Sequence, residues 1–263
     1  RGLGDVYKRQ LVKVKACGIC HTDLNIIEGI LKPPKYPHVL GHEIAGVIVD
    51  SKPSTDQEKK LIEEIISKYN GRVLVYFYIT CGRCAYCLRG ETNLCKYFKR
   101  IGFEEWGGYA EYVKVPISNL LPLPNELGYE AAILVDAGAT VYRAVRKLSI
   151  GPSSIVSIIG IGGLGSMAIQ MAKLYNARIV AIDIMHEKLK IAKELNADYV
   201  VDIRSIDVSA LLEEIKHLFG VDGVDAVIDT VGNNRTISVG MSMLKRGGKL
   251  LILGYGKELE VSL

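Results

Sequence analysis

The sequence predicts an α/β protein of two domains, a mostly-β domain at residues 11–145 followed by a doubly wound parallel sheet at residues 146–263. Three observations support this division. Up to about residue 140 the chain consists of short strand-like runs and loops. From about residue 150, strand-like and helix-like runs alternate strictly, which is typical of a parallel sheet with right-handed crossovers. A glycine-rich turn at 160–165 joins the first of these strands to the first helix, as in many doubly wound sheets.

The first domain is expected to contain four strands and one helix. Residues 11–16 alternate apolar and charged side chains, so one face of this strand should contact water. The other strands are expected within 41–50, 72–79 and 107–116. Residues 56–69 place apolar side chains at helical spacing and end at Asn70 and Gly71, a pair that closes helices. We interpret this helix as a surface insertion.

The second domain is expected to contain five strands, with a helix after each of the first four. The strands are expected near 155–159, 178–182, 199–202, 225–229 and 249–253. The helices are expected near 163–175, 186–195, 209–219 and 235–244. Residues 1–10 resemble a translated sequencing-adapter remnant, so we leave them out of the fold. A sheet of this type usually has about six strands, one more than the five expected here. We therefore expect a fragment that is poorly soluble or inactive as it stands.

Composition narrows the possible partners. The chain has 263 residues, of which 49% are hydrophobic and 24% charged, as in a globular protein with a sizeable core. No apolar run reaches the ~18 residues that a membrane helix needs. The formal net charge is only +4 and the basic residues are scattered. We therefore expect neither a nucleic acid nor a membrane as a partner.

Four of the six cysteines lie in the stretch CGRCAYCLRGETNLC, at Cys81, Cys84, Cys87 and Cys95. The two-residue gaps in C-x2-C-x2-C-x7-C let neighbouring sulfurs turn inward on one tight loop, as tetrahedral zinc requires. Disulfide knots belong to small secreted chains that lack a core, which does not fit this chain. We predict a structural zinc in a cytoplasmic protein, with a disulfide or an iron–sulfur cluster as the alternatives.

Five motifs stand in an order that resembles the zinc-dependent medium-chain alcohol dehydrogenases. They are CGICHTD at 17–23, GHEIAG at 41–46, the four-cysteine cluster, GGYAEYV at 107–113 and the glycine-rich turn. The resemblance extends from residue 11 to the end of the chain. It implies a GroES-like catalytic domain followed by a Rossmann domain, both incomplete here.

This resemblance implies a second, catalytic zinc. Cys20 and His42 match two of its ligands, and Asp136 matches the third, which is cysteine in most members of the family and aspartate in some. A carboxylate is an accepted zinc ligand and makes a harder site than a thiolate. The alternative for Asp136 is a cap on the helix that follows it. Glu43 matches a residue beside the metal, and Asp23 matches one that braces the ligand histidine.

The glycine-rich turn contains G-x-G-x-x-G at Gly160, Gly162 and Gly165. Such glycines let the backbone approach a pyrophosphate at the N-terminus of the helix. Asp183 ends the next strand, at the spacing of the acid that hydrogen-bonds the adenosine ribose, and its charge would repel a 2′-phosphate. We therefore predict NAD as the cofactor. The other residues that we assign to NAD binding, partly on the resemblance, are Gly163, Leu164, Lys188 and Thr140.

The resemblance also implies the chemistry, in which zinc lowers the pKa of an alcohol and NAD accepts a hydride. Thr22 matches the hydroxyl that begins a proton relay. Asn25 stands where many members of the family have the histidine that ends the relay. An amide does not titrate, so the last step of the relay should differ here.

We therefore predict an NAD-dependent dehydrogenase with two zinc ions per chain, acting on an alcohol, an aldehyde or a polyol, and forming a homodimer or homotetramer when full length. One alternative is a zinc-free quinone or enoyl reductase of the same fold. The cysteine cluster, together with Cys20 and His42, argues against it. The other alternative is a zinc-stapled protein that binds NAD(H) without catalysis. The presence of all three predicted ligands of the catalytic zinc argues against it.

Overall fold

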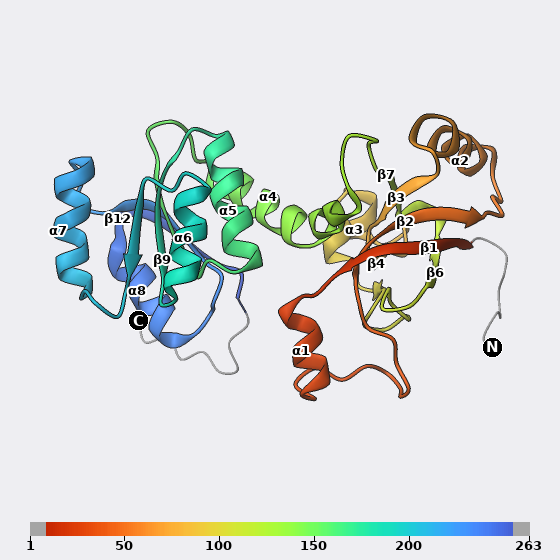
Figure 1. The fold of residues 1–263 in the computed structure, drawn as a ribbon, viewed down its shortest axis with the longest axis horizontal. Helices are drawn as coiled ribbons and strands as arrows, with labels where there is room; N and C mark the ends of the chain where they lie inside the picture. Colours follow the sequence, from red (N-terminus) through yellow and green to blue (C-terminus); the bar gives the residue numbers. More distant parts are fainter. Residues whose placement is uncertain (1–8, 255–263) are drawn as a thin grey trace. The chain divides into compact units, whose positions relative to one another are not determined.

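The structure, a computed structural model, describes residues 9–254 of the chain (Figure 1). The chain divides into two units, Arg1–Asp136 and Ala137–Leu263. The boundary predicted near residue 145 falls inside helix α4 (Ala137–Leu148), which belongs to the second unit. The reason is packing. Helix α4 has an apolar stripe that includes Val141 and Val145, and it packs against α5 of the second unit.

The first unit is built on an antiparallel sheet of short strands. Its strand order is β6-β1-β2-β3-β7. These strands are β1 (Arg9–Gly18), β2 (Glu43–Asp50), β3 (Arg72–Val75), β6 (Tyr112–Pro116) and β7 (Leu120–Pro122). One hydrophobic core forms around inward-facing side chains such as Val12, Ile44 and Val113. Strand β2 lies near the middle of this sheet and carries the GHEIAG motif at its start.

Two expectations for the first unit are corrected. Leaving residues 1–10 out of the fold is wrong for the last two, because Arg9 and Gln10 pair with β6 and the Gln10 side chain is 0% exposed. Backbone pairing does not depend on the origin of a sequence. The strand predicted at 72–79 is split into β3 and β4 (Tyr78–Ile79). The side chain of Asn119 donates to the carbonyls of Tyr76 and Tyr78, which turns the chain out of the sheet between the two strands.

Helix α2 (Asp56–Tyr69) has the predicted bounds. The Thr55 hydroxyl accepts a hydrogen bond from the Glu58 N–H, and Asn70 closes the helix in the left-handed conformation. The helix buries Ile62 and Ile65 and leaves its charged face exposed. It is therefore an amphipathic element at the surface of the first unit.

The second unit contains a parallel sheet of five strands, in the order β10-β9-β8-β11-β12. The strands are β8 (Ile155–Ile159), β9 (Arg178–Asp183), β10 (Tyr199–Asp202), β11 (Val224–Asp229) and β12 (Leu244–Ile252). The helices are α5 (Gly163–Leu174), α6 (His186–Glu194), α7 (Val208–Phe219) and α8 (Asn234–Met243). The strand order reverses between β8 and β11, and such sheets bind ligands at the carboxyl ends of the strands beside this point. The five predicted strands are all present, and β12 begins five residues before its predicted start.

Short elements near the motifs were not predicted. They are α1 (His21–Ile27), α3 (Ala85–Leu88), the 3-10 helices Thr92–Leu94, Ile117–Asn119 and Tyr129–Val135, and β5 (Lys99–Arg100), which pairs with β4. Cys20 is the N-cap of helix α1, and its N–H donates to the Asp23 carboxylate at 3.0 Å. Cysteine is not a usual N-cap, so the sequence gives little sign of this helix. Across residues 9–254, every helix is too short or too polar to cross a membrane.

Candidate active site

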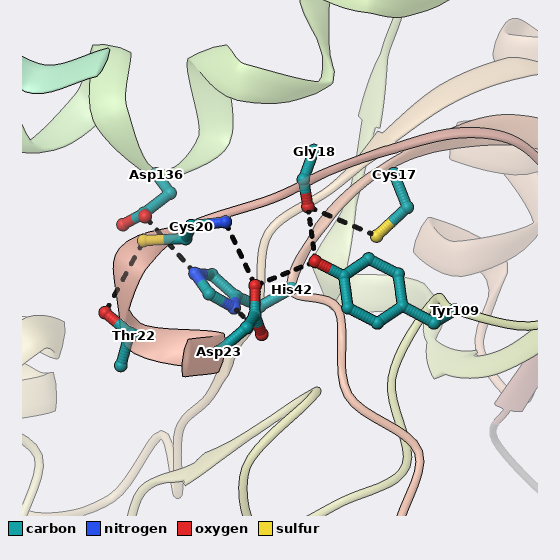
Figure 2. A network of polar contacts seen from close by, with 8 residues as sticks. All are labelled: Cys17, Gly18, Cys20, Thr22, Asp23, His42, Tyr109 and Asp136. Atoms are coloured by element: carbon teal, nitrogen blue, oxygen red, sulfur yellow. Dashed lines mark hydrogen bonds and ion pairs between the residues drawn. The ribbon is translucent and has the colours of Figure 1, made fainter. Parts of the chain in front are cut away.

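Three side chains from separate parts of the first unit converge on one point. The Cys20 thiol, the His42 imidazole and the Asp136 carboxylate each offer a ligand atom, and these atoms lie within 4.8 Å of one another (Figure 2). His42 Nε2 lies 3.3 Å from Asp136 Oδ2. Cys20 lies at the start of α1, His42 directly precedes β2, and Asp136 ends the 3-10 helix Tyr129–Val135. A sulfur, a nitrogen and an oxygen donor fit a zinc that has three protein ligands.

The surroundings of His42 favour a positive charge. The side chain is 1% exposed, and its ring packs against Phe77 and Phe103, with ring centroids 5.2 and 4.8 Å away. Its Nδ1 lies 3.4 Å from Asp23 Oδ1, so a carboxylate stands behind the ring. Burial lowers the pKa of His42, but the carboxylates of Asp136 and Asp23 outweigh it and raise this pKa to about 11. A metal ion bound at Nε2 would be shared with Asp136, and Nδ1 would keep its proton for Asp23.

Asp23 occupies the predicted bracing position. It is 1% exposed, and its Oδ2 accepts hydrogen bonds from the Cys20 N–H at 3.0 Å and from the Tyr109 hydroxyl at 2.8 Å. Burial raises the pKa of Asp23, but contacts with His42, Cys20 and Tyr109 outweigh it, and the pKa falls below its usual value. Asp23 is therefore a carboxylate behind His42, the arrangement that fixes the tautomer of metal-binding histidines.

The predicted catalytic side chains take different positions around this group. Thr22 lies beside the group, with its hydroxyl 3.4 Å from the Cys20 sulfur. Asn25, on the same helix, is 9% exposed. Glu43 is buried with its carboxylate against Gly18, where a Cβ on Gly18 would lie 1.9 Å from Glu43 Oε2. Glu43 therefore lies outside the group of three ligand atoms, and its predicted role beside the metal stays a prediction.

The four-cysteine cluster forms a second group. Its four sulfurs lie within 4.8 Å of one another, with 3.5 Å between Cys84 and Cys87 and 4.0 Å between Cys81 and Cys87. Sulfurs around a tetrahedral zinc would lie about 3.8 Å apart, whereas a disulfide brings them to about 2.05 Å. The separations therefore fit a shared metal and not a bonded pair.

The loop around the cluster also stabilises thiolates. Backbone N–H groups of Cys81 and Tyr97 point at the Cys95 sulfur, both at 3.4 Å. The backbone of Cys87 lowers the pKa of Cys84, burial opposes it, and the backbone of Lys96 helps to bring it to about 6. Burial and the neighbouring thiols raise the pKa of Cys87 to about 11. Because the four sulfurs lie so close together, four thiolates would repel one another. All four thiols can therefore lose their protons only when a cation binds among them.

The glycine-rich turn fits a phosphate ligand. Gly160 directly follows β8 with φ +86°, and a Cβ on Gly165 would lie 1.9 Å from the Gly160 carbonyl, so the turn and helix α5 pack tightly. Gly162 begins α5 with no side chain capping it, and Cβ atoms on Gly162 or Gly163 would meet open space. The first N–H groups of α5 are therefore left for an anion.

Asp183 ends β9 beside this turn and already has several partners. Its Oδ2 accepts a hydrogen bond from the Ile161 N–H at 2.6 Å, and its Oδ1 accepts from Ile184 and Met185 at 2.7 and 2.9 Å. Each carboxylate oxygen has two lone-pair directions. One acceptor position at Oδ2 therefore remains for a ribose hydroxyl, and Asp183 also ties the glycine-rich turn to β9.

The remaining predicted cofactor residues lie on three helices of the second unit. Leu164 follows Gly163 in the first turn of α5, Lys188 lies half-buried in the first turns of α6, and Thr140 lies on α4. Tyr109 is not among the site residues that the sequence predicts, although it contacts Asp23 across 86 positions of the chain. It lies in the GGYAEYV motif, but no spacing in the sequence shows this contact.

Comparison with known protein families matches both units. Residues 8–125 match the alcohol dehydrogenase GroES-like domain, and residues 163–263 match the zinc-binding dehydrogenase family. The first match spans most of the antiparallel unit, and the second spans most of the parallel sheet.

Individual proteins are similar over nearly the whole chain. An alcohol dehydrogenase of Geobacillus stearothermophilus is 36% identical over 255 residues, covering 96% of this chain and 72% of that protein. An NAD-dependent alcohol dehydrogenase of Sulfolobus acidocaldarius is 38% identical, covering 97% of this chain and 72% of that protein. The crystal structure of an alcohol dehydrogenase from Aeropyrum pernix has a TM-score of 0.82 and 33% identity, and the match covers 98% of this chain and 74% of that one. The resemblance inferred from the five motifs is confirmed: the chain belongs to the zinc-dependent medium-chain alcohol dehydrogenase family.

Proposed function

We propose that this protein oxidises an alcohol or a polyol with NAD, at a catalytic zinc held by Cys20, His42 and Asp136. The observation that carries the proposal is that these three donor atoms converge and that Asp23 braces one of the donors, His42, from behind. Three protein ligands leave a coordination position open for substrate, whereas the four-cysteine cluster is closed and would be structural. A zinc-free reductase of the same fold would need neither group.

Zinc, when bound, supplies a Lewis acid that lowers the pKa of a substrate hydroxyl. The residues of the chain would hold and orient the zinc ion. Asp23 keeps the Nδ1 proton on His42, so Nε2 is free to act as a ligand. The Thr22 hydroxyl, 3.4 Å from the Cys20 sulfur, both accepts and donates a proton, so it can pass the substrate proton onward.

NAD, when bound, accepts the hydride. The uncapped start of α5 at Gly162 would hold its pyrophosphate, and the free acceptor position of Asp183 would bind the adenosine ribose. We further propose that the protein acts in the cytoplasm, because unpaired metal-binding thiols persist in a reducing compartment. Assembly as a homodimer or homotetramer stays a prediction.

Cofactor choice tests this proposal. The protein is assayed with a panel of primary alcohols, secondary alcohols and polyols, and the formation of NADH is followed by its absorbance. We expect some of these compounds to reduce NAD. Asp183 should repel a 2′-phosphate by several kcal/mol, so kcat/KM should favour NAD over NADP by roughly 100-fold or more. Asp183→Ser combined with Ile184→Arg should shift the preference toward NADP. If the unmodified protein prefers NADP, the assignment of Asp183 is wrong.

The matched control for this experiment is Asp198→Ser. Asp198 also accepts a backbone N–H with its carboxylate, from Ile179 at 2.6 Å, but it precedes β10 at the other end of the sheet. The control should lower the unfolding temperature as Asp183→Ser does, and it should leave the cofactor preference unchanged.

The second prediction concerns the proton relay. Since Asn25 does not titrate, the pH profile of kcat should lack a histidine-like step from this position. Asn25→His should raise the rate near neutral pH, by no more than ~10-fold because a relay end contributes less than a direct acid or base. Asn25 is 9% exposed, so the unfolding temperature of the variant is measured in parallel. An unchanged profile would mean that the proton leaves by another route.

A further inference from the structure

We propose that Tyr109 is a positioning residue for the catalytic metal, acting through Asp23 on the ligand His42. The inference rests on the proposed function, because it needs His42 to be a metal ligand. It assigns a role to the tyrosine of the GGYAEYV motif, which touches none of the three ligand side chains in the hydrogen bonds described for residues 9–254.

A continuous set of contacts joins Tyr109 to the metal-binding group (Figure 2). The Tyr109 hydroxyl lies 2.8 Å from Asp23 Oδ2. The other oxygen of Asp23, Oδ1, lies 3.4 Å from His42 Nδ1. The far nitrogen of the same ring, Nε2, lies 3.3 Å from Asp136. One oxygen of the carboxylate is therefore hydrogen-bonded to the tyrosine, and the other faces the histidine ring.

The tyrosine must be the donor in this contact. Burial and the Asp23 carboxylate raise the pKa of Tyr109, so its hydroxyl keeps its proton. The hydroxyl also lies 3.0 Å from the Gly18 carbonyl, but it has one hydrogen to give. The carboxylate is the nearer acceptor and carries charge, and hydrogen bonds to charged acceptors are about twice as strong as neutral ones. The hydrogen therefore points at Asp23, with Gly18 as a weaker second acceptor.

The backbone places this hydroxyl with little freedom. Gly107, Gly108 and Tyr109 donate their N–H groups to the carbonyls of Val39, Gly41 and Leu40, at 2.7, 2.8 and 3.0 Å. A Cβ on Gly107 would lie 2.3 Å from the Gly41 carbonyl, so only glycine allows this approach. The segment is thereby fastened to the residues that lead directly into His42. Tyr109 is 40% exposed overall, but its hydroxyl points inward.

The energetic reason for the role is the burial of Asp23. A carboxylate that is 1% exposed needs hydrogen-bond donors, because it has lost its water. Within residues 9–254, its donors are the Cys20 N–H and the Tyr109 hydroxyl, both at Oδ2, while Oδ1 faces His42 without a hydrogen bond of normal length. Removing the tyrosine hydroxyl leaves one fixed donor, so the carboxylate can rotate away from Nδ1. His42 would then lose part of its orientation.

The test is Tyr109→Phe, which keeps the ring and removes only the hydroxyl. The protein is depleted of its catalytic-site metal with a chelator and titrated with Co²⁺, whose visible absorption reports the geometry of its ligands. Groups that brace a metal-binding histidine contribute about 10- to 100-fold to metal affinity. Since Tyr109 acts one contact further out, we expect the lower end, a roughly tenfold weaker Co²⁺ affinity with altered absorption bands. The matched control is Tyr112→Phe, an exposed tyrosine three positions later, which should change neither.

A double-mutant cycle tests the route through Asp23. In the Asp23→Asn background, the effect of Tyr109→Phe on Co²⁺ affinity should shrink well below tenfold, because the charged acceptor is gone. Effects that simply add would overturn the proposal. So would unchanged Co²⁺ affinity and absorption in Tyr109→Phe. Loss of the fold in that variant would also overturn it, since Tyr109 would then serve stability and not metal positioning. If the unmodified protein binds no Co²⁺ outside the four-cysteine cluster, the proposed function itself fails, which is a distinguishable result.

Discussion

Cys20→Ala is expected to remove one of two zinc ions and to lower kcat/KM by more than ~10³-fold while the protein stays folded. Loss of a single transition-state donor costs about 10²- to 10³-fold in other enzymes, and here the whole Lewis acid would be lost. Cys20 is half-buried at the start of α1, and its backbone N–H, which bonds to Asp23, is unaffected by the substitution. The fold should therefore survive. The measurements are elemental analysis, steady-state kinetics and thermal unfolding.

The chain offers a matched control three residues earlier. Cys17→Ala removes the same thiol from a residue that lies outside both metal-binding groups. Cys17 is half-buried, and burial raises its pKa to about 12, so it stays a neutral thiol that packs against the core. The control should keep both zinc ions and most of the activity. Fewer than two zinc ions in the folded, unmodified protein would falsify the two-metal assignment.

Cys84→Ala should produce the opposite pattern, a large loss of stability with the catalytic zinc retained. Structural zinc contributes on the order of 10 kcal/mol to the folding of small zinc domains, and opening one of four ligand positions forfeits part of this. We expect a loss of about 3 kcal/mol, which corresponds to roughly 6–12 °C in the unfolding temperature for a chain of this size. The cause is local, because the loop from Cys81 to Cys95 contains only α3 and one short 3-10 helix to hold it.

Thermal unfolding and metal content together test the prediction for Cys84→Ala. Below its new unfolding temperature, the Cys84→Ala protein should still oxidise alcohol at a rate close to that of the unmodified protein. Cys17→Ala again serves as the comparison, because a cysteine outside the cluster should shift the unfolding temperature far less. If Cys84→Ala left stability unchanged, the cluster would not be a structural metal site.

Long regular elements were predictable because their signal is local. The helix at 56–69 and the strand at 155–159 have the predicted bounds, since periodicity and end signals lie within a few residues of each other. The short helix α1 was not predictable. It has only seven residues and is capped by a cysteine, and the Asp23 carboxylate holds its start by accepting a hydrogen bond from the Cys20 N–H. The division between the units moved to Asp136 because α4 joins the side that covers its apolar stripe.

The sequence by itself determined the family, the order of the two folds and the residue types at both predicted metal groups. It could do so because the spacing of the cysteines and the glycine-rich turn are local patterns. Zinc binding requires the first and a close approach to a phosphate requires the second. Only the tertiary structure brought Asp136 to within 3.3 Å of His42, placed Glu43 against Gly18 and gave Asp183 three backbone partners. It alone connected Tyr109 to Asp23. Some of these contacts join residues that are distant in the chain, and others depend on the rotamer of a side chain. Tertiary packing and the need to give buried polar groups a hydrogen-bond partner decide both kinds of contact.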